Sequence, residues 1–63
     1  MTSIDFMNAC KEKDVIFKIV DNEFNICLGE GYSPEIKMSV DEDILKKDVD
    51  GWLIDDRIIS IYV

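Results

Sequence analysis

Residues 15–28 read VIFKIVDNEFNICL, and this stretch decides the predicted fold. Two runs rich in β-branched and aromatic residues flank Asp21-Asn22, a pair that favours a turn because both side chains tolerate a positive φ. Every second residue of a strand shares a face, so the two runs give one apolar set: Val15, Phe17, Ile19, Phe24, Ile26 and Leu28. The stretch therefore predicts a β-hairpin over residues 15–28 with that set facing the core.

The residues before the hairpin predict a short helix over 3–12. Thr2 can accept a hydrogen bond from the amide three residues on, and Asp5 lies near the positive end of the helix dipole. Apolar residues follow at spacings of three and four, and Lys11 and Lys13 suit the last turn. A helix this short does not persist alone in water, so it has to lie on an apolar surface.

Residues 35–40, EIKMSV, give the cleanest alternation in the chain and predict a third strand. The apolar members of this strand are expected to be buried: Ile36, Met38 and Val40. The preceding GEGYSP, residues 29–34, has two glycines but neither a GxGxxG nor a Walker pattern, so a plain loop is expected there instead of a phosphate site.

The C-terminal part predicts one more helical turn and two more strands. An S-x-x-E capping pattern precedes a short helix or 3₁₀ turn expected at 41–47. A short strand at 52–54, a turn at 55–56 and a final strand at 57–63 follow. The alternative is a single bent strand over 52–63.

These elements predict an α+β fold in which residues 1–63 form a single small domain. A short N-terminal helix would pack against a strongly bent antiparallel sheet of four or five strands, which can curl into a small barrel. The expected core consists of Phe6, Val15, Phe17, Ile19, Phe24, Ile26, Leu28, Ile36, Met38, Val40, Trp52, Ile54, Ile59 and Ile61.

A second apolar set occupies the opposite face of the same strands. Its members are Ile16, Val20, Cys27, Ile58 and Tyr62. An exposed sheet face is normally polar, so this surplus predicts that either the helix or another chain covers the face. The last strand carries no protective charge beyond Arg57, and such an edge invites pairing.

A helix followed by five strands, ending in residues 54–61 (IDDRIISI), resembles the layout and final strand pair of small SH3-like or Sm-like barrels. The chain lacks the Arg-Gly step that the Sm family has between its last strands and the Asp-x-x-Met-Asn signature after its third strand. The resemblance therefore implies a topology alone, and no family is assigned on it.

Composition argues against several kinds of site. The 63 residues include no His and two Cys, which cannot complete a tetrahedral zinc site, and no cofactor is expected. Cys10 and Cys27 each lie in an apolar run and are expected to be buried thiols, although a disulfide between them is arithmetically possible. No apolar run approaches the roughly 18 residues of a membrane span, so a cytoplasmic protein without membrane contact is expected.

Charge is the one global property that points towards function. Fourteen acidic residues against seven basic ones give a net charge of −7, which favours a basic partner and opposes direct nucleic-acid binding. Seven carboxylates lie within sixteen residues: Asp41, Glu42, Asp43, Asp48, Asp50, Asp55 and Asp56. Their spacing does not fit an EF-hand. They are therefore interpreted as a binding face for a basic partner, and the alternative is that they only keep the domain soluble.

The sequence thus favours a non-catalytic acidic module that binds a basic surface of a larger protein. A small inhibitor or regulator that mimics nucleic acid is one such role, and the alternative is a self-associating subunit of a homo-oligomer. The predicted partner-binding residues are the seven carboxylates together with Tyr32, expected to be exposed, whereas Trp52 is expected in the core. Without His, acid–base catalysis has little support, so no enzyme is expected. The richness in Ile, Lys, Asn and Asp is typical of an AT-rich genome, as in many bacterial viruses and mobile elements.

Overall fold

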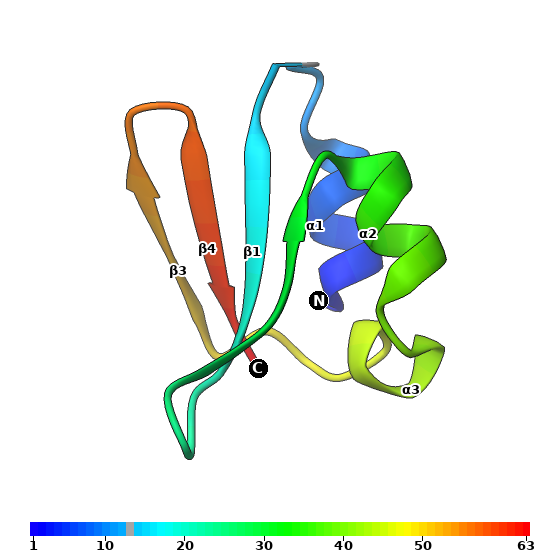
Figure 1. The fold of residues 1–63 in the computed structure, drawn as a ribbon, viewed down its shortest axis with the longest axis vertical. Helices are drawn as coiled ribbons and strands as arrows, with labels where there is room; N and C mark the ends of the chain where they lie inside the picture. Colours follow the sequence, from blue (N-terminus) through cyan, green and yellow to red (C-terminus); the bar gives the residue numbers. More distant parts are fainter. Residues whose placement is uncertain (13) are drawn as a thin grey trace.

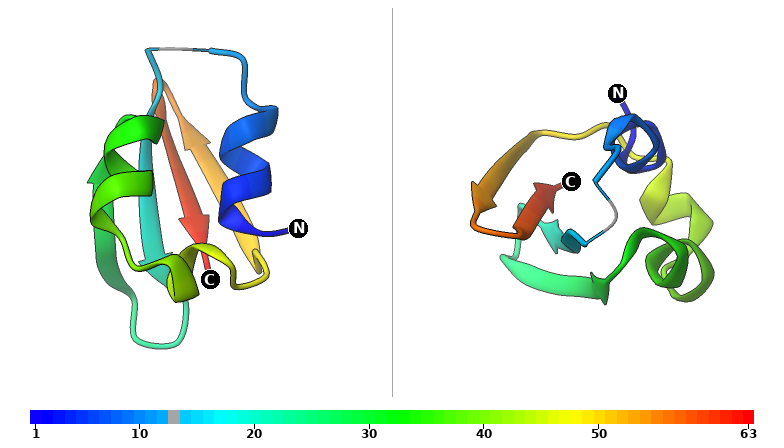
Figure 2. Two further views of the ribbon diagram at one scale, coloured as in Figure 1. Left: turned by 90° about the vertical axis from the view of Figure 1, so that its right-hand side faces the viewer. Right: turned by 90° about the horizontal axis from the view of Figure 1, so that it is seen from above.

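The computed structural model describes residues 1–12 and 14–63, and in them a sheet of four strands carries three helices on one face (Figures 1 and 2). In chain order the elements are α1 (Ser3–Ala9), β1 (Ile16–Asp21), β2 (Ile26–Gly31), α2 (Ser33–Ser39), α3 (Glu42–Leu45), β3 (Gly51–Asp55) and β4 (Ile58–Tyr62). The α+β prediction is confirmed.

The sheet is mixed, with strand order β2-β1-β4-β3. Two antiparallel hairpins, β1–β2 and β3–β4, meet through the parallel pair β1–β4 at its centre. The prediction of a wholly antiparallel sheet is therefore wrong. A parallel pair needs a long crossover, and the chain between β1 and β4, with α2 and α3 in it, supplies one. The outer strands β2 and β3 do not pair with each other, so the sheet stays open and the expected barrel is not formed.

Helix α1 begins as the sequence predicts, with a reciprocal cap. The amide of Asp5 donates to Thr2 Oγ1 at 3.2 Å, and the amide of Thr2 donates to Asp5 Oδ2 at 3.4 Å. The helix ends at Ala9, earlier than expected, so Lys11 lies beyond its last turn. The predicted role of Lys13 falls outside the described residues.

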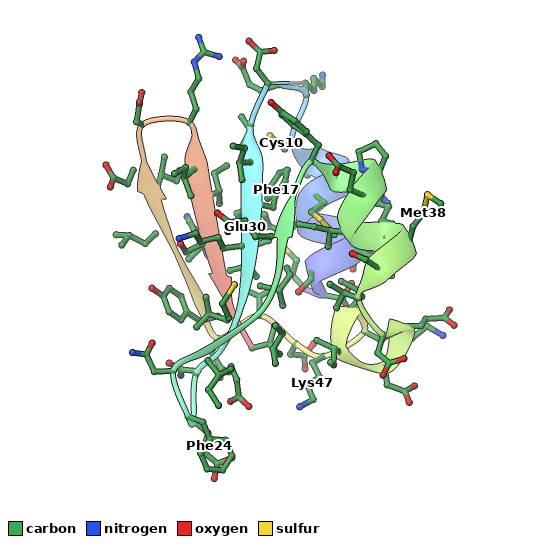
Figure 3. All side chains as sticks on the ribbon, in the orientation of Figure 1. Cys10, Phe17, Phe24, Glu30, Met38 and Lys47 are labelled. Carbon is green, nitrogen blue, oxygen red and sulfur yellow. The ribbon has the colours of Figure 1, made fainter. Side chains whose placement is uncertain are left out.

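Residues 33–39 form helix α2, so the strand predicted at 35–40 is wrong. Pro34 stands in the first turn, where its missing amide costs nothing, and the amide of Tyr32 donates to Glu35 Oε1 at 3.4 Å. Ile36 and Val40 are buried at a spacing of four residues, which a helix and a strand share. Met38, 89% exposed, points away from the sheet on the outer side of α2 (Figure 3).

The core lies between the sheet and the helices. It consists of Met7, Phe17, Ile19, Ile36, Val40, Leu45, Ile59 and Ile61. Five residues expected in the core are instead exposed: Phe24, Ile26, Met38, Trp52 and Ile54. Phe24 lies in the β1–β2 turn, beyond the reach of the helices (Figure 3). Cys10 and Cys27 are both free, with Cys10 half-buried and Cys27 exposed, so the expectation of two buried thiols is wrong.

The second apolar set lies on the helix-free face, as predicted. The register places Ile16 opposite Ile58 and Val20 opposite both Cys27 and Tyr62. Val20 is only 8% exposed although no helix covers this face. Its neighbours on β2 and β4 therefore bury it within the sheet.

Candidate protein-interaction surfaces

The structure divides the seven predicted carboxylates between opposite ends of the molecule. Asp41, Glu42 and Asp43 open helix α3, and Asp48 and Asp50 lie in the segment that leads from α3 to β3. Asp55 and Asp56 end β3 and begin the β3–β4 turn, at the other end of the longest axis (Figures 1 and 2). The sequence cluster is therefore not one continuous face.

The end that carries α3 also receives two carboxylates from the β1–β2 turn, Asp21 and Glu23 (Figure 1). A hydrogen bond of 3.4 Å from Asn22 Nδ2 to Asp50 Oδ2 ties this turn to the segment before β3. We call these residues the acidic end: Asp21, Glu23, Asp41, Glu42, Asp43, Asp48 and Asp50. Sequence reasoning missed Asp21 and Glu23 because they lie far along the chain from Asp50, and only the fold brings the turn to the segment before β3.

Few cations lie at the acidic end, and two of them already form ion pairs with its carboxylates. Lys46 Nζ lies 3.1 Å from Glu42 Oε1, and the N-terminal ammonium lies 3.7 Å from Asp48 Oδ1. Lys47 is exposed at the same end (Figure 3). Within the part of the chain that the structure describes, Asp41 and Asp43 have no cation within 4 Å. The acidic end is therefore an exposed, negatively charged surface.

The end that carries Asp55 and Asp56 is electrically mixed. Arg57 Nη1 lies 2.8 Å from Asp14 Oδ2 there. Tyr32, 45% exposed as expected, lies at the start of α2 and borders a hollow of about 400 Å³ with Lys11 and Glu12. Tyr32 is thus separated from the acidic end by the length of α2 (Figure 1).

Strand β3 forms a second candidate surface. The open edge was expected at the last strand of the chain, but β4 lies between β1 and β3, so that expectation is wrong and the edge is β3. Trp52, Leu53 and Ile54 are 58%, 58% and 61% exposed. Trp52 and Ile54 pair with the core residues Ile61 and Ile59 of β4, so they lie on the helix side of the sheet. The ring of Phe6 in α1 lies against the Trp52 ring at a centroid distance of 5.4 Å, and the helices leave more than half of each of the three side chains exposed. We call the three residues the β3 edge.

A hollow separates the β3 edge from helix α1. It has a volume of about 330 Å³ and is lined by Met1, Phe6, Ala9, Cys10, Trp52 and Ile59. Its lining is almost entirely apolar. Such a surface suits contact with protein more than binding of a polar metabolite.

Neither a cluster of metal ligands nor a membrane-spanning helix is found among the described residues. In residues 1–12 and 14–63, no three His, Cys, Asp or Glu side chains come together as a metal site. None of the helices described is long and apolar enough to span a bilayer.

Comparison of the chain with protein-family models, curated proteins and solved structures gives no match. The function proposed below therefore rests on the geometry and charge of this chain.

Proposed function

We propose that this chain is a non-catalytic protein-interaction module that binds a basic surface of a larger protein through its acidic end. The observation that carries the proposal is the gathering of seven carboxylates from three separate segments at one end of the longest axis. Attraction between opposite charges speeds encounter and fixes orientation, and it acts on exposed groups without requiring a deep pocket.

The state of the carboxylates supports this use of the surface. The side chains of Asp41, Glu42 and Asp43 are all exposed, at the N-cap and in the first turn of α3. Consecutive residues of a helix point about 100° apart, so the three carboxylates fan out around this end. The capping hydrogen bonds of α3 come from backbone groups, since the side chain of its N-cap residue Asp41 accepts none. These carboxylates are therefore available to a partner without loss of a described intramolecular contact, apart from the exposed Glu42–Lys46 pair.

Binding at this end suggests a role as a small inhibitor or regulator. A basic surface on a larger protein normally receives a polyanion, and the acidic end offers several carboxylates in place of phosphates. Occupation of that surface would keep the polyanion out. This role, in a cytoplasmic setting, is the function we propose.

The test is capture of partners from the source cell by the immobilised full chain at about 0.05 M and then 0.5 M NaCl, where screening shortens the reach of exposed charges. A specific partner should be retained at low salt and lost at high salt. The double substitution Asp41→Lys and Asp43→Lys should weaken its binding at least about tenfold, because attraction becomes repulsion.

The matched control reverses two exposed carboxylates near the other end, Glu12→Lys and Asp55→Lys. It changes the net charge by the same amount and should leave the captured partner in place. Capture that resists salt, or that both double variants reduce equally, would reject the acidic end as the binding surface.

Self-association is a second candidate function, favoured by the exposed β3 edge. It uses a different surface from the acidic end, so the two functions are compatible.

A further inference from the structure

The β3 edge is an unpaired sheet edge without the usual protection. Natural edge strands carry charge, proline or a bulge within the strand, and such features prevent pairing with another chain. Residues 52–54 of β3 have none of these, and all three are large and apolar. The one charge of the strand, Asp55, stands at its last residue. An edge of this kind is a template for another strand.

The backbone of β3 presents its free hydrogen-bonding groups at two of these residues. Asp55 and Ile58 close the two-residue turn of the β3–β4 hairpin. In an antiparallel ladder the inward and outward groups alternate, so Leu53 bonds towards β4 while Trp52 and Ile54 direct their N–H and C=O groups to the open side. An added strand would bond to Trp52 and Ile54.

We propose that a second copy of this chain occupies the β3 edge, with the two β3 strands antiparallel about a twofold axis at Leu53. In this register Trp52 of each copy lies opposite Ile54 of the other, and both are bonded pairs. Leu53 of the two copies meet across the axis on the helix-free face. Asp55 lies opposite Gly51, so no carboxylate opposes another within the strand. The strand is thus complementary to itself, as a twofold interface requires.

The area available suits a weak dimer. At about 60% exposure, the three side chains of the β3 edge offer on the order of 350 Å² of apolar surface per copy. A standard stable interface needs about 800 Å² per partner. Met1, 67% exposed, and the hollow beside α1 border the same edge and extend the apolar surface. An interface of this size belongs to the weak, transient class, so the dimer is expected only at high protein concentration.

Charge makes the dimer depend on salt in a recognisable direction. Each copy carries a net charge of −7, so the two repel at low ionic strength, and screening relieves the repulsion. Added salt should therefore strengthen the dimer, whereas it weakens binding of a basic partner. Because the two β3 strands run in opposite directions, the two acidic ends point away from each other and stay free.

The main experiment is sedimentation of the full chain from about 1 to 300 µM in 0.05 M and 0.5 M NaCl, with emission of the single tryptophan, Trp52, read in parallel. We expect a dimer that is favoured by salt and a shift of the Trp52 emission to shorter wavelength as the copies associate. Leu53→Lys should weaken the dimer at least about tenfold, because it places two ammonium groups at the axis. Met38→Lys is the matched control, with the same charge change on an exposed side chain of α2, and should dimerise at least as well as the wild type.

A cross-link tests the register. With Cys10→Ser and Cys27→Ser in the background, Leu53→Cys places two thiols on a non-hydrogen-bonded pair, where Cα atoms are about 4.5 Å apart and a disulfide fits. Mild oxidation should give a covalent dimer, and Met38→Cys in the same background should not.

A wild-type chain that stays monomeric at about 300 µM in 0.5 M NaCl overturns the proposal. So does a dimer that Leu53→Lys leaves intact, or one in which Leu53→Cys cross-links no better than Met38→Cys. A monomer whose Trp52 emission shifts only when a captured protein is added also overturns it and assigns the β3 edge to that protein. Each result is independent of the acidic-end variants, so failure of the dimer and failure of basic-partner binding are separately visible.

Discussion

The two edge strands of the sheet, β2 and β3, differ in the features that could prevent pairing with another chain. On β2, a bulge opposite Ile19 and Val20 interrupts the ladder, and Glu30 lies 3.9 Å from Lys18 in an ion pair across the strands. The chain then turns directly into α2, and Val40, the C-cap residue of that helix, lies against Gly29. On β3, the ladder to β4 runs without interruption, and the outward side carries Trp52 and its neighbours.

The comparison shows that the chain protects one edge of the sheet, β2, against pairing with another strand, and leaves the other edge, β3, open. A bulge, a charge and a following helix all make β2 a poor template for another strand. Strand β3 has neither a bulge nor a following helix, and its one charge, Asp55, stands at its last residue. In a chain this small the helices have enough surface for about one side of the sheet, so the strand farthest from α2 remains uncovered (Figure 2).

The largest expected effect comes from removing the anchor of α2 near the protected edge. Ile36 is completely buried, so Ile36→Ala should lower the free energy of unfolding by about 2–5 kcal/mol, enough to unfold much of a small domain. Met38→Ala on the same helix should change it by less than about 0.5 kcal/mol. Urea denaturation followed by circular dichroism measures both. Equal losses at the two positions would mean that residues 33–39 pair as a strand with both side chains buried.

A smaller loss of stability should distinguish alanine substitution at Gly29, in β2, from the same substitution at Gly51, in β3. A methyl group at Gly29 would overlap Val40 Cγ2, so Gly29→Ala should cost about 1–3 kcal/mol of stability. A methyl group at Gly51 of β3 would meet no atom within 4 Å, so Gly51→Ala should be neutral or slightly stabilising. The comparison is read from the midpoints of thermal unfolding. A neutral Gly29→Ala would show that α2 does not close against β2.

The smallest effect should come from the exposed edge itself. Trp52→Ala removes the tilted ring contact with Phe6 and should cost about 0.5–1.5 kcal/mol in the monomer. Leu53→Ala, equally exposed but on the helix-free face, should cost less than about 0.5 kcal/mol. Unfolding has to be measured at low micromolar concentration, where self-association adds little. A large loss at Leu53 under those conditions would mean that β3 is covered within the monomer.

The hairpins were predictable because their signals are local. A β1–β2 hairpin was predictable from the apolar runs on either side of Asp21-Asn22, but its details were wrong: the turn spans residues 22–25 with its positive φ at Asn25, and β2 continues to Gly31 through part of the expected loop. The β3–β4 pair follows from two apolar runs around a short acidic turn. The cap of α1 at Thr2 depends on residues three positions apart, so it too was predictable. Each of these features involves neighbours along the chain.

The identity of α2 was not predictable from alternation. Ile36 and Val40 lie four residues apart, which places them on one face of either a helix or a strand. The position of Met38 separates the two structures: a strand would bury it with Ile36 and Val40, whereas the helix exposes it. Pro34 in the first turn was the local signal for a helix, and the alternating pattern outweighed it. The exposure of Trp52 was also missed. Tryptophan is highly buried on average, and the sequence does not show that the helices leave β3 uncovered.

The candidate surfaces were partly predictable in composition and not in arrangement. The excess of carboxylates is a property of the sequence, but their division between two ends, and the addition of Asp21 and Glu23 to one of them, depends on how the hairpins meet. The β3 edge likewise exists only because β1 pairs with β4, which leaves β3 outermost.

The sequence by itself determined the presence of both hairpins, the first helix, the two-faced apolar character of the sheet and the net negative charge, although it misplaced the bounds and the inward side of β2. Only the tertiary structure decided the parallel central pair, the helix at 33–39, the exposed β3 edge and the acidic end. Turns, caps and alternation arise from the stereochemistry of adjacent residues, so they can be recognised without knowledge of the rest of the chain. Strand order and burial arise from contacts between residues far apart in sequence, whose competition is settled only when the whole core packs.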